Sequence, residues 1–210
     1  MALALDGSVQ GNSGGSATLS VTLTTTRSPD VICVTFTCNA GPLSSVTASA
    51  PGLGTFTQRA TANVTTTADF WYAIATQPLT AVSITATQSG GSAFITMTAF
   101  GISGANTLAP FDTNASLPAS STPPVSISTS NANDFLIGTM RTASANGTVD
   151  SGFTAISNAN FNLTEYDIVT ATVSSLSIGV TGAGNAAIGD AVVSAPPPVP
   201  VNLGFAWQEW

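Results

Sequence analysis

Hydrophobic and polar residues alternate along most of the chain with a period of two. In SATLSVTLTTT, Leu19, Val21 and Leu23 fall on one side of an extended chain, and serine and threonine fall on the other. Such alternation predicts a β-strand with one buried face. Similar runs follow, separated by Gly, Pro, Asn and Ser: DFWYAIAT, AVSITATQ, AFITMTAFGI, DFLIGTM, EYDIVTATV and AAIGDAVV. No segment has sustained helical periodicity, so we predict an all-β fold.

The run DVICVTFTC differs because it is apolar at nearly every position through Phe36. This pattern indicates a strand that is covered on both faces. Cys33 and Cys38 lie five residues apart in the run, so they point to opposite faces and are too far apart for a disulfide. We predict two free thiols that serve as packing residues.

The second part of the chain repeats the first. SPDVICVTFT resembles NANDFLIGTM, GTFTQRA resembles SGFTAIS, DFWYAIAT resembles TEYDIVTAT, and the order of the segments is kept. The halves could be two small domains, or they could contribute strands to one sandwich. Each half supplies few strands for a free-standing sandwich, so we favour a single two-sheet β-sandwich, jelly-roll-like, with an internal pseudo-repeat.

The expected organisation has three parts. Residues 1–16 form a glycine-rich N-terminal arm, and residues 17–195 form the sandwich. The sandwich halves, 17–105 and 125–195, are joined by a Pro/Ser-rich crossover that we expect to run over the surface. Residues 196–210 form a proline-rich C-terminal arm. Glycine-rich and proline-rich ends cannot fold alone, so we expect neighbouring subunits to hold both arms.

Composition removes several classes of function. Charged residues make up 6% of the chain, with three arginines, ten carboxylates, no lysine, no histidine and a net charge of −7. This excludes Ser-His-Asp and Schiff-base catalysis and histidine-ligated metal sites. Three arginines are too few to bind nucleic acid, and no apolar run is long enough to span a membrane. We therefore expect no enzyme, no metal and no cofactor, and a solubility that rests on Ser, Thr, Asn and Gly helped by the acidic balance.

The carboxylates are among the few side chains left as candidates for a catalytic or metal-binding site. Asp30 and Asp134 occupy matching positions directly before an apolar strand, where aspartate commonly caps a turn. Asp112 and Asn114 in FDTNAS are the nearest approach to a calcium site. No further carboxylate lies close to them in the sequence, so we predict solvated loop residues there.

Three aromatic residues beside carboxylates are candidate glycan contacts. Trp71 and Tyr72 follow Asp69, and Tyr166 follows Glu165, with Asp69 and Glu165 placed at matching positions of the two halves. An aromatic ring beside a carboxylate could hold a sugar ring. The alternative is that all three are ordinary strand residues.

The end of the chain carries candidate interface residues. APPPVPV is expected to form a stiff polyproline II spacer, and NLGFAWQEW follows it. Tryptophan and its aromatic neighbours are enriched in binding hot spots, so we predict that this arm docks on a neighbouring subunit. The alternative is that it folds back on its own sandwich. The predicted interface residues are Leu203, Phe205, Trp207 and Trp210.

The runs VTLTTTRSPDVICVTFT, DFWYAIAT, ANDFLIGTM and TEYDIVTA resemble β-sandwich modules of phage structural proteins and bacterial surface proteins. The resemblance covers roughly residues 15–195 and rests on strand patterns. It implies a jelly-roll-like body with a structural or adhesive role, and it carries over no active-site residue.

These observations lead to two functional hypotheses. The first is a virion structural protein, made in the host cytoplasm and placed on the outer surface of a tailed phage or phage-like particle as a decoration, cement or head-fibre protein. Its partners would be other virion proteins and its own copies, in a homo-oligomer such as a trimer. The second is a carbohydrate-binding module of a tail fibre, spike or bacterial surface protein, with a host glycan as ligand.

Overall fold

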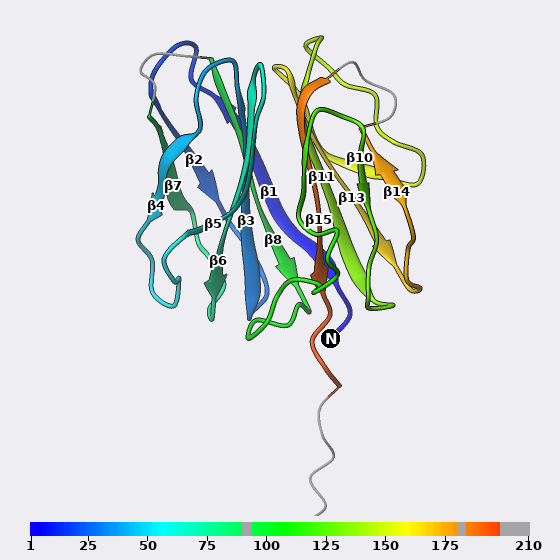
Figure 1. Ribbon diagram of the computed structural model, residues 1–210. Helices are drawn as coiled ribbons and strands as arrows, with labels where there is room; N and C mark the ends of the chain where they lie inside the picture. The colour runs from blue at the N-terminus through cyan, green and yellow to red at the C-terminus, as the bar shows by residue number, and fades with distance from the viewer. Residues whose placement is uncertain (90–93, 180–183, 198–210) are drawn as a thin grey trace, which may run out of the picture.

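The computed structural model describes residues 1–89, 94–179 and 184–197, and every regular element within these ranges is a β-strand. All strand pairs among them are antiparallel. The predicted all-β, sandwich-like fold is therefore confirmed. The described strands form four sheets rather than two, and Figure 1 shows them stacked as layers.

The first half of the chain builds two of these layers. We call the larger one inner sheet 1, which has five strands, and the smaller one outer sheet 1, which has three. In spatial order, inner sheet 1 contains β1 (Ala4–Asn12), β8 (Ile95–Ser103), β3 (Asp30–Cys38), β6 (Thr67–Ala75) and β5 (Thr57–Asn63). Outer sheet 1 contains β2 (Thr18–Leu23), β7 (Val82–Gln88) and β4 (Leu43–Ala48).

The second half builds the other two layers. Inner sheet 2 has five strands and outer sheet 2 has two. In spatial order, inner sheet 2 contains β12 (Thr154–Ala159), β13 (Asn162–Val169), β11 (Asp134–Thr142), β15 (Gly184–Val193) and β9 (Ala119–Ser121). Outer sheet 2 contains β10 (Val125–Ile127) and β14 (Leu176–Ile178).

The two halves have the same topology, so the sequence repeat is a structural repeat. The order β1-β8-β3-β6-β5 in inner sheet 1 corresponds to β9-β15-β11-β13-β12 in inner sheet 2. Register supports the match: Tyr72 pairs with Cys33, three residues after Asp30, and Tyr166 pairs with Ile137, three residues after Asp134. Tyr72 and Tyr166 are therefore equivalent positions.

The stacking of the layers follows from how the side chains alternate. In β2 only every second residue is buried, which suits an outer layer, whereas every residue of β3 and β11 is buried. Even-numbered residues of β3, such as Val34, pack against outer sheet 1, and odd-numbered residues, such as Val31, pack against inner sheet 2. Leu136 of β11 packs in turn against outer sheet 2. Each half thus covers one face of its own inner sheet, and the two inner sheets cover each other.

This arrangement differs from the single two-sheet sandwich that we expected. A two-sheet sandwich covers only one face of each sheet, but the central strands here are apolar on both faces and need a layer on each side. The halves are not independent either, because Phe70 and Phe100 share one core with Phe135 of the second half.

The expected N-terminal arm and crossover also differ from the structure. Within the predicted N-terminal arm, residues 4–12 form β1 and pair with the edge of β8, with a bulge at Gly7. The predicted crossover is not only a surface loop, since it contains strand β9 and the half-buried Phe111. Of the predicted C-terminal arm, residues 196 and 197 are described and exposed. The predicted interface residues Leu203, Phe205, Trp207 and Trp210 lie outside the described residues.

The two ends of the layered body differ in the chain segments that they carry. At one end, Ala4 pairs with Ser103 in β8, and Ala105 bridges to Ser194 just after β15. We call this end the terminal pole, and it is the lower end in Figure 1. The opposite end, the far pole, holds the end of β1, the start of β8 and the hairpin between β12 and β13.

Candidate functional site

Nearly all described carboxylates point into the protein. Eight of them are buried, and Asp167 is half-buried. The buried ones are Asp6, Asp30, Asp69, Asp112, Asp134, Asp150, Glu165 and Asp190. The acidic groups that we expected to help solubility at the surface are thus mostly inside, and the outer faces carry hydroxyl groups such as those of Thr18, Ser20 and Thr22.

Asp6 and Asp30 form a buried carboxyl pair at the terminal pole. Asp6 accepts hydrogen bonds from the backbone N–H groups of Thr26 and Arg27 and from the Thr26 hydroxyl, at 2.7–3.1 Å. Burial alone would raise the pKa of Asp6, but these bonds outweigh it and hold the pKa below its ordinary value. Burial, followed by the hydrogen bond and charge of Asp6, raises the pKa of Asp30 to about 7. Asp30 is therefore the member of the pair that takes up a proton more readily.

The second half contains the same pair. Asp112 accepts backbone N–H bonds from Asn114, Ser130 and Asn131 at 2.7–2.8 Å, and these hold its pKa below the ordinary value despite burial. Burial, followed by the charge of Asp112, raises the pKa of Asp134 to about 7. The turn-capping role that we predicted for Asp30 and Asp134 therefore belongs to their partners, Asp6 and Asp112. Asp112 is also a buried residue that organises its loop, rather than a solvated one.

A third carboxyl pair joins Glu165 to Asp150. The backbone N–H of Asp150 donates to Glu165 Oε2 at 2.9 Å, and the Asp150 carboxylate accepts the N–H of Gly179. Burial, followed by the nearby charge of Asp150, raises the pKa of Glu165 to about 8. Asp69 has no equivalent of this pair. It lies opposite Phe36, six residues after Asp30, whereas Glu165 lies opposite Gly138, four residues after Asp134. The predicted match of Asp69 with Glu165 is therefore wrong by two residues.

The three candidate glycan contacts are half-buried side chains that pack against the core and do not share one surface. Trp71 packs against the core between inner and outer sheet 1, and Tyr72 points the opposite way, towards inner sheet 2. The Tyr72 ring meets the edge of Phe111 at 4.7 Å, and the Tyr166 ring stacks on Phe135 at 4.8 Å. The alternative interpretation, that they are strand residues that pack the core, describes their positions.

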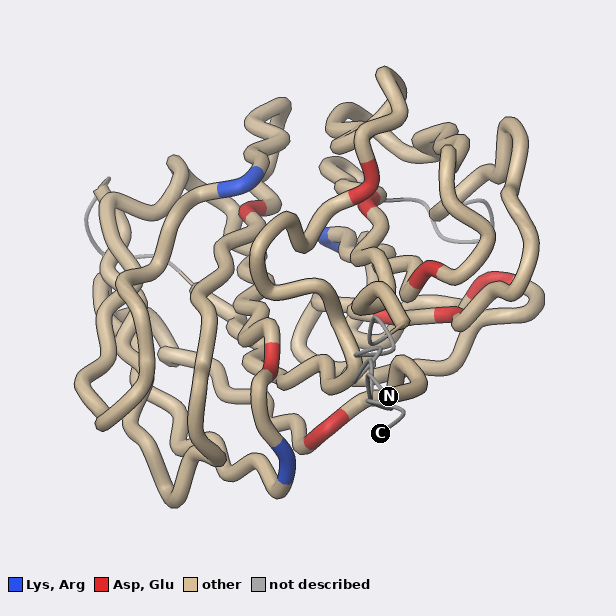
Figure 2. Tube along the Cα trace, turned by 90° about the horizontal axis from the view of Figure 1, so that it is seen from below, with Lys and Arg blue, Asp and Glu red and all other residues tan. Residues whose placement is uncertain are grey.

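The arginines are far apart along the trace in Figure 2, and each has a different environment. Arg27 is exposed. Arg59 forms a 2.8 Å ion pair with the fully buried Asp190 and lies over the Phe111 ring at 4.3 Å, so it links the two halves. Arg141 is 9% exposed and has no carboxylate partner among the described residues.

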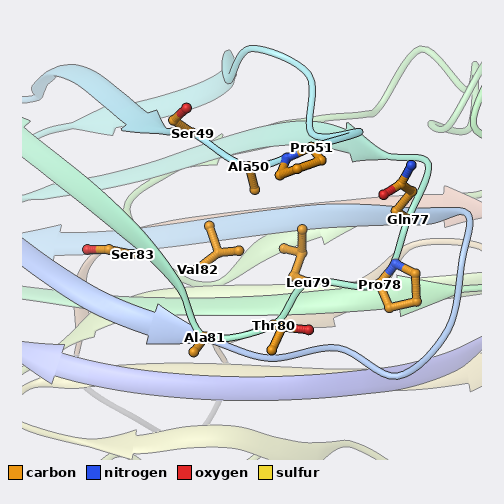
Figure 3. A pocket seen from close by; sticks show the side chains of 10 residues that line it. All are labelled: Ser49, Ala50, Pro51, Gln77, Pro78, Leu79, Thr80, Ala81, Val82 and Ser83. Atoms are coloured by element: carbon orange, nitrogen blue, oxygen red, sulfur yellow. The ribbon is translucent and has the colours of Figure 1, made fainter.

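One hollow, of about 400 Å³, lies at the edge of outer sheet 1 (Figure 3). The Leu79 and Val82 side chains face Ala50 and Pro51 across it, and Gln77 is the most polar residue in its wall. None of its lining residues is titratable. It therefore offers packing surface and little chemistry.

A different hollow, which we call the seam pocket, combines aromatic, amide and cationic groups. It measures about 370 Å³ and lies at the far pole, where the two halves meet. Its lining residues are Asn12, Asn39, Phe94, Ile95, Thr96, Arg141, Asn160 and Phe161. The seam pocket is not apparent in the sequence because its residues come from five separate segments. The one local signal is ANFN, which places phenylalanine in a tight hairpin turn where glycine is usual.

The described residues contain no group of three or more His, Cys, Asp or Glu side chains that could hold a metal ion. No helix long and apolar enough to span a membrane occurs among them. A scan against protein-family models finds no match for the chain, and searches of curated proteins and of solved structures also find no significant match.

Proposed function

We propose that this protein is a structural component on the outer surface of a phage or phage-like particle, acting as a decoration, cement or head-fibre protein through adhesion to other subunits. The observation that supports this proposal most is that the first residues of the chain and residues 194–197, the last that the structure describes, lie together at the terminal pole (Figure 1). A body attached at this pole would project its far pole away from the particle.

At the terminal pole, core packing and backbone hydrogen bonds fix both ends of the described chain. Leu3 is buried in the core between the inner sheets, and the N–H of Ala195 donates to the carbonyl of Gly104 at 2.8 Å. The N–H of Ser194 donates to the carbonyl of Asn133 at 3.1 Å. Tension on either terminus is therefore passed to both halves at once, as an attachment point requires.

The chemistry of the described body also suits an adhesive role. Most of its described carboxylates are held in internal pairs, and none lines the hollows of about 320–410 Å³ found among the described residues. The outer faces present hydroxyl and amide groups, which hydrogen-bond to many surfaces without strong charge selectivity.

The test is incorporation into purified particles. We expect the wild-type chain at a fixed copy number, and we expect a chain that ends at Ala195 to be lost from the particle. A full-length variant with four alanines tests the aromatic anchor without shortening the chain; it replaces Leu203, Phe205, Trp207 and Trp210. Wild-type incorporation of both variants, or absence of the protein from particles, would refute the proposal.

A further inference from the structure

We propose that the seam pocket binds an acidic saccharide, with Arg141 holding its anionic group, Phe94 and Phe161 packing on its ring, and asparagine amides bonding its hydroxyl groups. This inference goes beyond the adhesive role, and it places a recognition site at the pole opposite the attachment end.

The charge of Arg141 is not neutralised by a carboxylate among the described residues. Its Nη1 donates to the carbonyls of Asn160 and Phe161, at 3.4 and 3.1 Å, and its guanidinium lies over the Phe161 ring at 4.6 Å. Its Nε and Nη2 groups have no hydrogen-bond partner among the described residues and are not enclosed. Burial lowers the pKa of Arg141, but an arginine still stays charged. A largely buried cation without a counter-charge favours an anionic ligand, which a guanidinium holds through two parallel bonds.

The second line of argument is the exposure of two phenylalanine rings. Phe94 is 62% exposed and Phe161 is 40% exposed, and they lie in the wall of the same hollow. Large apolar side chains gathered at a concave polar site are typical of ligand pockets. An aromatic face packs well against the C–H face of a sugar ring.

The third is the backbone of the β12–β13 hairpin. Asn160 and Phe161 have positive φ values of 53° and 62°. Asparagine tolerates this conformation, whereas a bulky aromatic residue is strained in it and glycine is preferred. Strain of this kind is retained where a side chain serves a function. Here it holds the Phe161 ring at the mouth of the pocket.

The fourth is the set of unused amides. Asn12, Asn39 and Asn160 are exposed, and none of their side-chain amides hydrogen-bonds within the described part of the chain. An amide both donates and accepts, which matches the neighbouring hydroxyl groups of a sugar.

The position of the pocket selects the ligand class. Peptides commonly bind by adding a strand along a sheet edge, but this pocket lies at the ends of strands. Nucleic acids require several cations along a track, and the pocket has one. A single anionic group beside hydroxyl groups on a compact ring is the chemistry that fits.

The test is an NMR titration of the full-length protein with tri-glucuronate and with the matched neutral probe maltotriose. We expect saturable shifts at the seam pocket with the acidic probe, and at least ten-fold weaker binding of the neutral one. Equal binding of the two probes, or no binding of tri-glucuronate at millimolar concentration, would overturn the proposal. So would equally tight binding of an acidic peptide such as tri-glutamate.

Variants identify the site. Phe94→Ala changes an exposed residue and should weaken binding at least ten-fold with an unchanged melting temperature. Phe161→Gly should weaken binding, because the ring is lost. It should also raise the melting temperature, because glycine adopts the positive φ without strain. If Phe161 had only a structural role, its replacement would not weaken binding while raising the melting temperature. Arg141→Gln should abolish binding, and Arg27→Gln is the matched control. Unchanged binding in both phenylalanine variants would refute the site. Particle incorporation of Phe94→Ala should stay normal, so this proposal and the adhesive role can fail separately.

Discussion

Asp30 and Asp134 occupy the same position in the two halves: each begins the central strand of its inner sheet, and each has a pKa raised by burial and by a neighbouring aspartate. The partners, Asp6 and Asp112, are held ionised by hydrogen bonds from turns near the terminal pole. Because the protonated members sit fully buried, their ionisation is coupled to folding.

The free energy of unfolding should therefore fall as the pH rises from about 4 to 8. The pKa of Asp30 and Asp134 is about 7 in the folded protein and that of Glu165 is about 8, well above the values of 3.8 and 4.5 for free side chains. The folded state binds more protons than the unfolded state in this window. The stabilisation from these carboxyl groups is therefore complete below pH 4, and it is lost as the pH rises through each folded pKa. Asp6 and Asp112 act in the opposite sense below pH 4, so we expect a maximum near pH 4–5. Urea unfolding at unit pH steps measures the profile.

Asp30→Asn tests the origin of this profile, because an amide cannot ionise as the pH rises. If the variant matches the wild type at pH 5, we expect it to exceed the wild-type free energy of unfolding by about 2–3 kcal/mol at pH 8. Asp167→Asn is the control, since Asp167 is only half-buried. A pH profile that is unchanged in Asp30→Asn would show that the pair does not titrate in this range.

The ion pair between Arg59 and Asp190 should couple the two halves. Arg59→Gln leaves the carboxylate of Asp190 buried without its cation, which typically costs about 3–5 kcal/mol. Because Asp190 can take up a proton to escape this cost, the loss should be larger at pH 8 than at pH 5. Adding Asp190→Asn to Arg59→Gln should restore most of the stability. We expect the exposed Arg27→Gln to change the free energy of unfolding by less than about 0.5 kcal/mol. A change that small in Arg59→Gln would contradict the coupling role of the ion pair.

The two cysteines should report on separation of the halves. Both are free and fully buried, with Cys33 in the core between the inner sheets and Cys38 in the core beneath outer sheet 1. Burial raises the pKa of both thiols, which further slows their reaction. We expect neither thiol to react with an aromatic disulfide reagent in the native protein, and both to react at the rate of unfolding. Faster labelling of Cys33 in a Cys38→Ser variant than of Cys38 in Cys33→Ser would mean that the halves part before they unfold.

Gly104→Ala should loosen the terminal pole. Gly104 has φ of +77°, and a Cβ there would lie 2.2 Å from the carbonyl oxygen of Ala2. We expect a loss of about 2–4 kcal/mol, measured by thermal unfolding, with faster proteolysis of the N-terminus. Gly14→Ala is the control for backbone strain alone, because Gly14 has φ of +59° and no atom within 4 Å of an added Cβ. Equal losses in the two variants would rule out the steric contact as the cause.

The sequence predicted the strands and the repeat because both depend on local alternation. It also held evidence against a two-sheet sandwich: the apolar positions Val31–Phe36 require cover on both faces, which only additional layers supply. Only one member of each of the two aspartate pairs could be matched in the sequence. Asp30 and Asp134 match through the repeat, whereas Asp6 comes from strand β1 and Asp112 from a loop, so no repeated segment connects them. The seam pocket was out of reach because it depends on how the two halves meet.

The common face of the two halves has a consequence for one half on its own. Tyr72 and Tyr166, equivalent in the repeat, pack against the same core between the inner sheets, so each half contributes equivalent surface to the contact. Equivalent surfaces on both partners are characteristic of two-fold symmetric dimers. One half produced without the other would therefore expose this surface, and we expect it to cover the surface by pairing with a second copy of itself.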